Sequence, residues 1–290
     1  MAGVRERAEW LAATLVSAPV LSRVTGRLSD LRLPPALLLP LIRAYTHAFG
    51  VDLEEAAEPI ERHRTFNGFF TRRLREAARP IDTSAGTLVS PCDARLSVIG
   101  AVPPDGRLEQ VKGSHYSLEA LLGSAEDAEP FRNGSHATLY LSPAMYHRVH
   151  APVDGYVRAW RYVPGRLFPV NGAGVRAIPG LFTRNERVCI LCDSEAHGRV
   201  AVVMVGAANV GRISLSFADL VTNRGAAAAR VLAQWPIPVA RGDELGIFNL
   251  GSTVVLLVAD PALAPAGPSA GDLVHMGRPL WRRRSRSWRS

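Results

Sequence analysis

Short apolar runs separated by turn residues fill the chain from about residue 86 onward, and they constrain the fold more than any other feature. Gly, Pro or Asp stands between them, and the runs are 96–102, 137–141, 156–162, 188–191, 200–205, 212–216 and 253–258. Runs of this length, bounded by turn residues, are typical of β-strands. The pattern predicts a compact β-rich body of mixed-sheet type, with one short helix at 117–122.

The first 64 residues have the pattern of helices instead. Apolar residues recur there at helical spacing, and the stretches that show this are 4–15, 21–31 and 37–42. We expect Pro19 to end the first helix, Pro40 to break the third stretch, and Gly50 to end the last helix. The sequence therefore predicts the α+β class, with a helical N-terminal part before the β-rich body.

Two shorter helices are expected between these parts. Asp52, with an acidic residue three positions later, forms a variant of the capping box and predicts a helix start. Thr65 can cap a second helix over 66–74, whose phenylalanines form an apolar stripe. The arginines that follow, from Arg72 to Arg79, are expected to lie on a solvated face.

The chain is strongly basic, with a net charge of +8. Such an excess indicates an anionic partner, either a membrane surface or a nucleic acid. Aromatic residues make up 7% of the chain and no RNA- or DNA-binding motif is recognisable, which favours a membrane and no nucleic acid. The last segment, 281–290, combines arginine with tryptophan, so we expect a disordered tail suited to anionic head groups.

The N-terminal helices also suit a membrane surface. Their apolar faces are edged by arginine, as in helices that lie in a membrane interface, although the same faces could pack on the protein's own body. No run approaches the roughly 20 apolar residues needed to span a bilayer. The N-terminus has no clean signal-peptide cleavage site, so export is not expected. Residues 1–64 are therefore predicted to form a membrane-associating region.

Three cysteines cannot form a disulfide framework. Cys189 and Cys192 are expected on one strand, where positions three apart point to opposite faces. Shared metal binding or a disulfide between them is therefore not expected, and a reducing compartment fits best.

The segment Leu250-Gly251-Ser252-Thr253 leads directly into the last apolar run. It can be read as an ordinary loop or β-bulge, because Gly permits unusual dihedrals and Ser and Thr bond local backbone. It can also be read as a reactive pair, in which Ser252 attacks the carbonyl of Gly251. Residues earlier in the chain decide between these interpretations.

A proline-bounded loop holds the densest group of chemically active side chains. His147 and His150 lie within it, and Asp93 follows a Ser-Pro-Cys turn further upstream. With Ser252, these residues could form a Ser-His-Asp arrangement, which is defined by roles and not by sequence order. They could alternatively be the ligands of a zinc hydrolase, with Ser252 merely structural. A third alternative is a non-catalytic membrane-binding module.

The ordered set of motifs resembles the phosphatidylserine decarboxylases, which are pyruvoyl enzymes of phospholipid synthesis. The matching stretches run in family order over residues 65–258. They are TFNGFF at 65–70, RPID at 79–82, VKG at 111–113, YSL at 116–118, LLG at 121–123, YHRVHAP at 146–152, FPVN at 168–171, NERV at 185–188, VGA at 205–207, VG at 210–211, GDELGIF at 242–248 and LGST at 250–253.

The resemblance implies a protein that cuts itself and then decarboxylates a lipid. Asp93 would orient His150, and His150 would take the proton of Ser252 as it attacks Gly251. The chain would be cut between 251 and 252, leaving a pyruvoyl cofactor made from Ser252. That group would bind the substrate amine covalently and accept the electrons released as carbon dioxide leaves phosphatidylserine to give phosphatidylethanolamine. His147 would supply the proton to the resulting carbanion.

The resemblance also implies the remaining features of the enzyme. Val170 and Asn171 would contact the substrate by motif match, and no metal would be needed. Ala94 and Met145 depart from the residues common in the family, which bears on local geometry or head-group preference more than on the reaction. The decarboxylase domain would span 65–280.

The expected partners are a phospholipid substrate and an anionic membrane surface. The two cleavage products would stay together as a heterodimer, and a homodimer is possible. The expected location is the cytoplasmic face of the cell membrane, as a peripheral protein.

Overall fold

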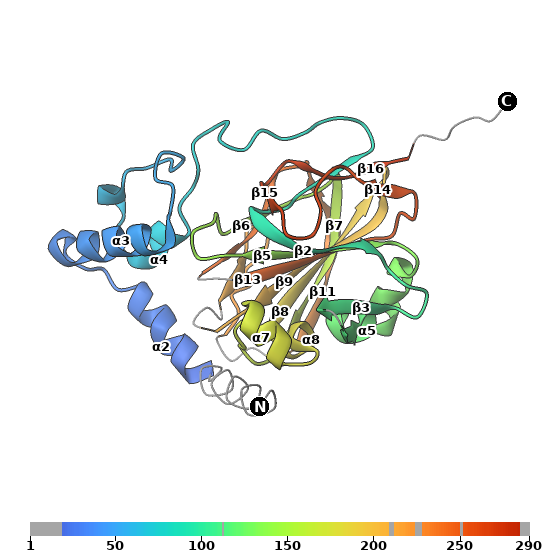
Figure 1. The fold of residues 1–290 in the computed structure, drawn as a ribbon, viewed down its shortest axis with the longest axis horizontal. Coiled ribbons are helices and arrows are strands. Elements are labelled where there is room, and N and C mark those ends of the chain that lie inside the picture. Colours follow the sequence, from blue (N-terminus) through green and yellow to red (C-terminus); the bar gives the residue numbers. More distant parts are fainter. Residues whose placement is uncertain (1–18, 112, 209–211, 224–227, 250–251, 285–290) are drawn as a thin grey trace.

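The computed structural model describes residues 19–111, 113–208, 212–223, 228–249 and 252–284. Helices gather at the N-terminal end, and a β-rich body follows (Figure 1). The α+β class predicted from the sequence is therefore confirmed. The first expected helix, over 4–15, and residue Gly251 lie outside the described residues.

An eight-stranded sheet forms the centre of the body. Its order is β11 (Ala229–Val239), β7 (Gly155–Val163), β8 (Arg187–Ser194), β9 (Gly198–Gly206), β13 (Ser252–Val258), β5 (Ser135–Leu141), β2 (Ala94–Ala101) and β15 (Leu273–Val274). Every neighbouring pair is antiparallel, so the expectation of a mixed sheet was wrong. Apolar runs alone do not distinguish a mixed sheet from an antiparallel one, because the strands of a sheet that is covered on both faces are apolar throughout in both kinds of sheet.

Strand β13 lies in the middle of this sheet, between β9 and β5. All seven of its residues are buried. Val254 and Leu256 face one hydrophobic core, whereas Val255 and Leu257 face the other. Cys189 and Cys192 on β8 divide between the same two cores, which confirms that they point to opposite faces.

Short helices cover one face of the sheet. They are α5 (Leu118–Leu122), α6 (Ala125–Ala128), η2 (Glu129–Phe131), α7 (Gly172–Ala177) and α8 (Leu181–Arg184). The short helix predicted at 117–122 is confirmed as α5. Its Leu118, Leu121 and Leu122 are buried, and the Ser117 side chain caps it. In Figure 1, α5, α7 and α8 lie together beneath the sheet, beside the strand β3.

Three smaller sheets complete the body. They are β1 (Thr87–Val89) with β16 (Pro279–Arg283) and β14 (Leu263–Pro265); β10 (Ile213–Leu215) with β12 (Glu244–Phe248) and β6 (Arg148–His150); and β3 (Arg107–Val111) with β4 (Ser114–Ser117). Trp281 is buried within β16, so residues 281–283 belong to the folded body. The expectation that a disordered tail begins at 281 was wrong there, because an indole of this size contributes to the core.

The N-terminal part contains α2 (Pro19–Ser29), α3 (Pro35–Phe49), η1 (Ile60–Arg62) and α4 (Phe66–Phe70). Gly50 adopts the left-handed conformation and ends α3, as predicted. Pro40 does not break α3, however, and lies within it on the exposed side. Water can solvate the carbonyl that loses its partner there, which lowers the cost of an internal proline. Pro19 is the first described residue and lies in α2, so the helix end expected there is not tested.

The segment between α3 and α4 is mostly irregular. Asp52 accepts a hydrogen bond from the Glu54 amide within a turn, so the helix expected there was wrong. Thr65 caps α4 through the Gly68 amide, as predicted, but α4 ends at Phe70. Aspartate bonds equally well to turn and helix amides, which makes the capping pattern ambiguous.

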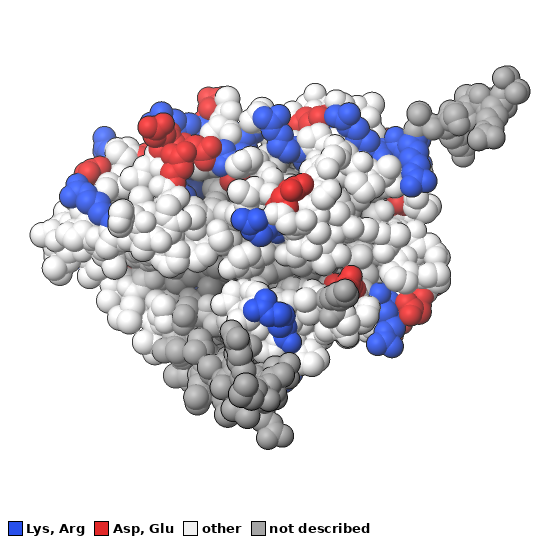
Figure 2. All heavy atoms as spheres, viewed as in Figure 1, with Lys and Arg blue, Asp and Glu red and all other residues white. Residues whose placement is uncertain are grey.

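One side of the N-terminal helices packs inward and another faces outward. Leu38 and Ile42 of α3 are buried with Phe69 of α4. Exposed apolar side chains on the other side are Val24, Leu28, Leu31, Leu37, Leu41 and Phe49. In Figure 2, charged side chains gather along the upper edge, and the flank at α2 and the lower side of α3 is mostly uncharged. No helix among the described residues is both long and apolar enough to cross a bilayer.

Candidate active site

Ser252 is the first residue of β13 and lies between Leu141 of β5 and Gly206 of β9. Its side chain is buried, with 1% relative exposure. Its Oγ has no hydrogen-bond partner among the described residues. An unpaired buried hydroxyl is unfavourable, so its presence at the end of a fully packed strand points to a chemical role.

A cavity of about 310 Å³ opens at Ser252, and we call it the Ser252 cavity. Val170 and Asn171, predicted from the sequence to contact substrate, lie in its wall beside Ala207 and Ala208. Tyr45 and Phe49 of α3 form another wall, and Phe70 of α4 adds to the apolar lining. The cavity therefore joins the end of the central sheet to the N-terminal helices.

The wall that carries Val170 is held in place by Asn185. The Asn185 side chain accepts a hydrogen bond from the Phe168 amide at 2.9 Å and donates to the Phe168 carbonyl at 2.9 Å. It also donates to the carbonyl of Gly206, the β9 partner of Ser252, at 2.8 Å. Asn185 thus ties the wall directly to the strand beside Ser252.

His147 is fully buried and packs 4.1 Å from the Phe70 ring, centroid to centroid. Its Nδ1 lies 2.8 Å from the Met145 carbonyl, which can only accept, so Nδ1 carries the proton. Nε2 is then the lone-pair nitrogen, and it has no partner among the described residues. Burial lowers the pKa of His147 to about 3, which keeps the ring neutral.

His150 is also buried, but both of its ring nitrogens are engaged. Nδ1 donates to the Gly242 carbonyl at 2.7 Å, and Nε2 lies 3.1 Å from the Tyr146 hydroxyl. Since the carbonyl fixes the tautomer, Nε2 accepts from the tyrosine. Burial lowers the pKa of His150, and the nearby charges of Glu244 and Asp93 partly offset that effect.

Asp93 is buried immediately before β2, and its carboxylate contacts an arginine and not His150. Its carboxylate accepts hydrogen bonds from Arg79 at 2.6–3.0 Å and from the Met276 amide at 2.9 Å. His275 Nδ1 lies 3.7 Å away. The direct Asp93–His150 hydrogen bond expected from the sequence is absent, because Arg79 occupies the carboxylate and His150 has other partners.

Burial alone raises the pKa of Asp93, but the hydrogen bonds from His275 and Arg79 outweigh it. The pKa therefore lies below its ordinary value, and Asp93 is ionised at neutral pH. The same Arg79 guanidinium donates to both oxygens of Glu55 at 2.6–2.7 Å. Arg79 and Arg72 are buried, so the solvated face expected for these arginines was wrong at both positions.

Sequence reasoning missed four residues of this region: Arg79, Glu55, Tyr146 and Asn185. Tyr146, Arg79 and Asn185 lie within motifs that carry the family resemblance, which was the available signal. Glu55 lies outside those motifs. For Glu55 and Asn185, the sequence gave no indication of the partner. Their partners lie 24 and 17–21 residues away in sequence.

His147, His150 and Asp93 do not assemble as ligands of one metal ion. Arg79 is bonded to the Asp93 carboxylate. The free Nε2 of His147 contacts neither His150 nor Asp93 through a hydrogen bond. Within the described ranges, no group of three or more His, Cys, Asp or Glu side chains is placed to hold a metal.

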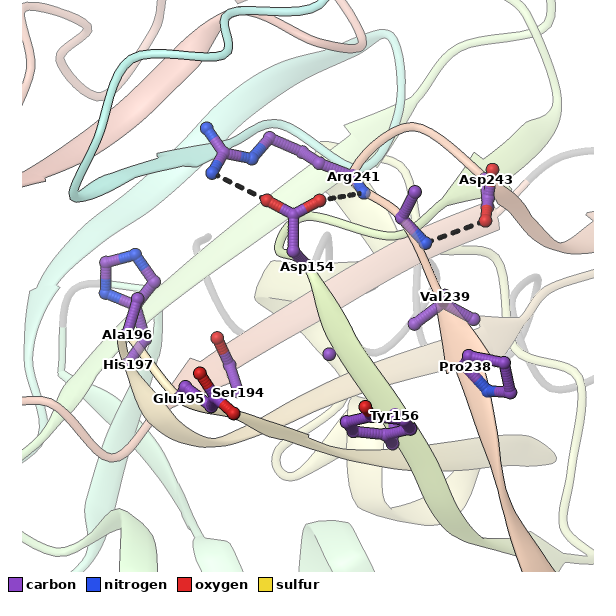
Figure 3. A pocket seen from close by; sticks show the side chains of 12 residues that line it. Asp154, Tyr156, Ser194, Glu195, Ala196, His197, Pro238, Val239, Arg241 and Asp243 are labelled. Carbon is purple, nitrogen blue, oxygen red and sulfur yellow. Dashed lines mark hydrogen bonds and ion pairs between the residues drawn. The ribbon is translucent and has the colours of Figure 1, made fainter.

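Another cavity, of about 730 Å³, lies at the β8–β9 turn and the segment joining β11 to β12. Figure 3 shows Arg241 reaching over Asp154, which accepts from both its amide and its guanidinium. Asp243 accepts from the Ala240 amide. None of the site residues predicted from the sequence lines this cavity.

A family model and the relatives named below carry the same description. The family model for phosphatidylserine decarboxylase matches residues 66–282. A phosphatidylserine decarboxylase proenzyme from Anaeromyxobacter sp. (strain K) is 43% identical over 281 residues, which cover 93% of this chain and 96% of that protein. The proenzyme from Marinobacter nauticus is 44% identical over 251 residues, 83% of this chain and 85% of its own. The proenzyme from Bordetella pertussis is 43% identical over 269 residues, 90% and 89% of the two chains. This chain therefore belongs to the phosphatidylserine decarboxylase family and is a decarboxylase of phospholipid biosynthesis.

Proposed function

We propose that the chain cuts itself at Gly251-Ser252 and then uses a pyruvoyl group, formed from Ser252, to convert phosphatidylserine to phosphatidylethanolamine and carbon dioxide. The observation that carries this proposal is the unpaired, buried Ser252 hydroxyl at the Ser252 cavity. The word "proenzyme" in the names of the relatives also supports a chain that is processed.

Self-cleavage needs only atoms of the chain and one water. The Ser252 oxygen attacks the Gly251 carbonyl, and the peptide nitrogen leaves, so that an ester replaces the amide. Loss of the Cα proton then breaks the bond between Cβ and the ester oxygen, which leaves a carboxylate on Gly251. The dehydroalanine at 252 takes up water and releases ammonia, giving the pyruvoyl group at the new N-terminus.

His150 is the proposed base for the first step. Its Nε2 is the basic nitrogen, and it must exchange the Tyr146 hydrogen bond for the Ser252 hydroxyl in order to act. Asp93 would support it through its negative charge, which favours protonation of His150. Asp93 would not orient the His150 ring through a hydrogen bond, because its carboxylate is bonded to Arg79.

His147 is the proposed proton donor in decarboxylation. Its free Nε2 must first take up a proton, because Nδ1 is bonded to Met145. The same free nitrogen makes an exchange of the two histidine roles a specific second assignment. Phe70 supports it, since this ring contacts His147 and also lines the Ser252 cavity.

The pyruvoyl carbonyl, once formed, supplies an electron sink for the leaving carboxylate. The residues around it would bind the head group and exclude water. Val170 and Asn171 are the proposed head-group contacts, and the aromatic rings of Tyr45, Phe49 and Phe70 would keep the reacting carbon in an apolar environment.

A lipid substrate places the enzyme at a membrane surface. We infer a peripheral protein on the cytoplasmic face of the cell membrane, bound to anionic lipid through α2 and α3. The exposed Leu28, Leu37, Leu41 and Phe49 support this, because they offer apolar area on the two helices that also supply Thr25, Tyr45 and Phe49 to the wall of the Ser252 cavity. We keep the proposed boundary between residues 64 and 65. The boundary between 280 and 281 falls inside β16, so residues 281–283 are assigned to the decarboxylase domain.

The two cleavage products would stay together as a heterodimer. Strand β13 would begin the second product, and it is paired with β9 and β5 along its whole length. A homodimer remains a further proposal. Its support is the edge strand β11, where Leu232 and Trp235 are exposed.

The experiment that tests the proposal compares the wild type with Ser252→Ala. The purified wild type should release carbon dioxide from phosphatidylserine vesicles and should lose activity after treatment with phenylhydrazine, which attacks keto groups. Ser252→Ala should stay as one chain and show no activity. A zinc hydrolase would instead lose activity on chelation, and a non-catalytic module would release no carbon dioxide. An active, uncut Ser252→Ala chain would refute the proposal.

A further inference from the structure

A second cavity, of about 430 Å³, adjoins the Ser252 cavity and shares Tyr140 and Val170 with it. We call it the polar cavity. It lies on the face of the central sheet where α7 and β3 are in contact, and Figure 1 shows these elements beside each other. Ser252, the two histidines and Asp93 do not line it.

Two buried threonines whose hydroxyls have no partner in the described part of the chain line the polar cavity, and we call this part of the cavity its floor. Thr138 of β5 and Thr253 of β13 line it, and each has 1% relative exposure. Neither Oγ1 has a hydrogen-bond partner among the described residues. The Tyr116 hydroxyl lies near Thr138, also outside hydrogen-bonding geometry. Unpaired hydroxyls on neighbouring strands are costly, so they indicate a polar occupant of the cavity.

Charged side chains surround the mouth of the polar cavity. Arg95, Arg176 and Glu109 line it and are exposed. Arg95 donates to the Gly271 carbonyl. Within the described part of the chain, neither arginine forms an ion pair with a carboxylate. Two unpaired guanidinium groups suit a phosphate oxyanion, which they can bind in bidentate fashion.

The floor and the mouth therefore recognise different chemical groups. The arginines fit a phosphate, whereas threonine hydroxyls and the Glu109 carboxylate fit hydroxyl groups, which both donate and accept. A fully charged ligand without hydroxyls would leave the floor unpaired and would meet the negative Glu109. The combination fits a phosphate ester of a polyol, of the glycerol phosphate type.

We propose that the polar cavity is a second ligand site, separate from the Ser252 cavity, for a hydroxylated phosphate ester. The phosphate binds Arg95 and Arg176 at the mouth, and a hydroxyl reaches Thr138 and Thr253 on the floor. Thr253 directly follows Ser252, and Val170 is common to both cavities, so an occupant contacts the frame of the catalytic cavity. The ester is either a soluble compound or the head group of an anionic phospholipid.

The test measures the melting temperature and the Kd of the purified full chain with two probes. Glycerol 3-phosphate represents the soluble ester, and dihexanoyl phosphatidylglycerol, below its micelle concentration, represents the lipid head group. A shift with glycerol 3-phosphate assigns the site to a soluble ester. A shift with the short-chain lipid alone assigns it to a phospholipid, and either result supports the site.

Arg176→Gln should raise the Kd of the effective probe at least about tenfold, since one arginine–phosphate contact is lost. The matched control is Arg107→Gln, which removes the same charge from an exposed position on β3 outside the cavity. The control should leave the Kd unchanged. Equal weakening in both variants would show general charge attraction and would overturn the proposal.

Thr138→Val tests the floor without changing charge or size. Its control is Thr87→Val, because Thr87 also has a buried, unpaired hydroxyl but lies outside the polar cavity. Both variants should melt no lower than the wild type without ligand, and only Thr138→Val should weaken binding. A cavity that holds water alone would give no shift with either probe in the wild type, and that result would overturn the proposal.

Discussion

Replacement of Arg79 by methionine should destabilise the protein strongly, because it leaves a buried carboxylate without its main partner. The side chains of Arg79 and Asp93 have relative exposures of only 8% and 6%. Arg79 joins Asp93 to Glu55, which is more exposed, at 36%. After the substitution, Asp93 keeps the Met276 amide and the more distant His275. Most of the loss should therefore come from Asp93.

Removal of one partner from a buried ion pair costs about 3–5 kcal/mol. The more exposed Glu55 is screened by solvent and should add little. For a chain of this length, each kcal/mol should lower the melting temperature by about 2 °C, so the melting temperature should fall by about 6–10 °C at pH 7. The matched control is Arg158→Met, whose ion pair with Asp193 has relative exposures of 59% and 38% and should contribute about 0–1 kcal/mol.

The loss should depend on pH with a definite sign. The pKa of Asp93 lies below its ordinary value in the folded protein, so its stabilisation is present above a pH of about 4 and is lost as the pH falls through the folded pKa. Without Arg79, burial should raise that pKa, and protonation then removes the unpaired charge. The difference in melting temperature between the wild type and Arg79→Met should therefore decrease as the pH falls from 7 toward 4.

Differential scanning calorimetry at several pH values provides the assay, with the extent of chain cleavage matched by mass spectrometry. The double variant Arg79→Met/Asp93→Asn should recover much of the lost stability at pH 7, because it carries no buried charge. If Arg79→Met melts within about 2 °C of the Arg158→Met control, the buried pair contributes no more than an exposed one, and the reasoning is wrong.

Three further predictions concern processing, the cavity wall and the membrane. His150→Ala should leave the chain uncut, whereas His147→Ala should cut but decarboxylate slowly; a reversed pattern on denaturing gels would exchange their roles. Gly174→Ala would place a Cβ 1.8 Å from a main-chain oxygen of the cavity wall, so kcat/KM should fall roughly 10- to 100-fold, while Gly26→Ala, in open space, should not change it. Deletion of 285–290 should reduce the salt dependence of binding to anionic vesicles in flotation, and full-length protein that fails to float at low salt would contradict surface binding.

The central strand could be predicted because its signal is local. Strand β13 has a continuous apolar run rich in β-branched residues, and the structure places it, fully buried, between two other apolar strands. The roles of Gly50 and Thr65 at helix ends could be predicted for the same reason, since each residue acts within one turn of its own helix. The position of Pro40 inside a helix could not be predicted in this way, because a helix accommodates an internal proline more easily on the side that faces solvent, and the sequence does not show which side of α3 that is.

The sequence identified several residues of the candidate site but not the contacts that those residues make. Ser252, Val170 and Asn171 do meet at one cavity, as the motifs suggested. The partners of Asp93 lie 14 and 183 positions away along the chain, and no spacing rule connects them. A buried aspartate accepts whichever donors the fold brings to it, so its partner follows only from the assembled sheets.

Intact-mass spectrometry of the purified wild-type protein tests the central claim most directly. We expect two chains, residues 1–251 and 252–290. The second, of 39 residues, should begin with a pyruvoyl group and resist Edman degradation. The same preparation should decarboxylate phosphatidylserine. A single uncut chain of 31.3 kDa with full decarboxylase activity would contradict the account.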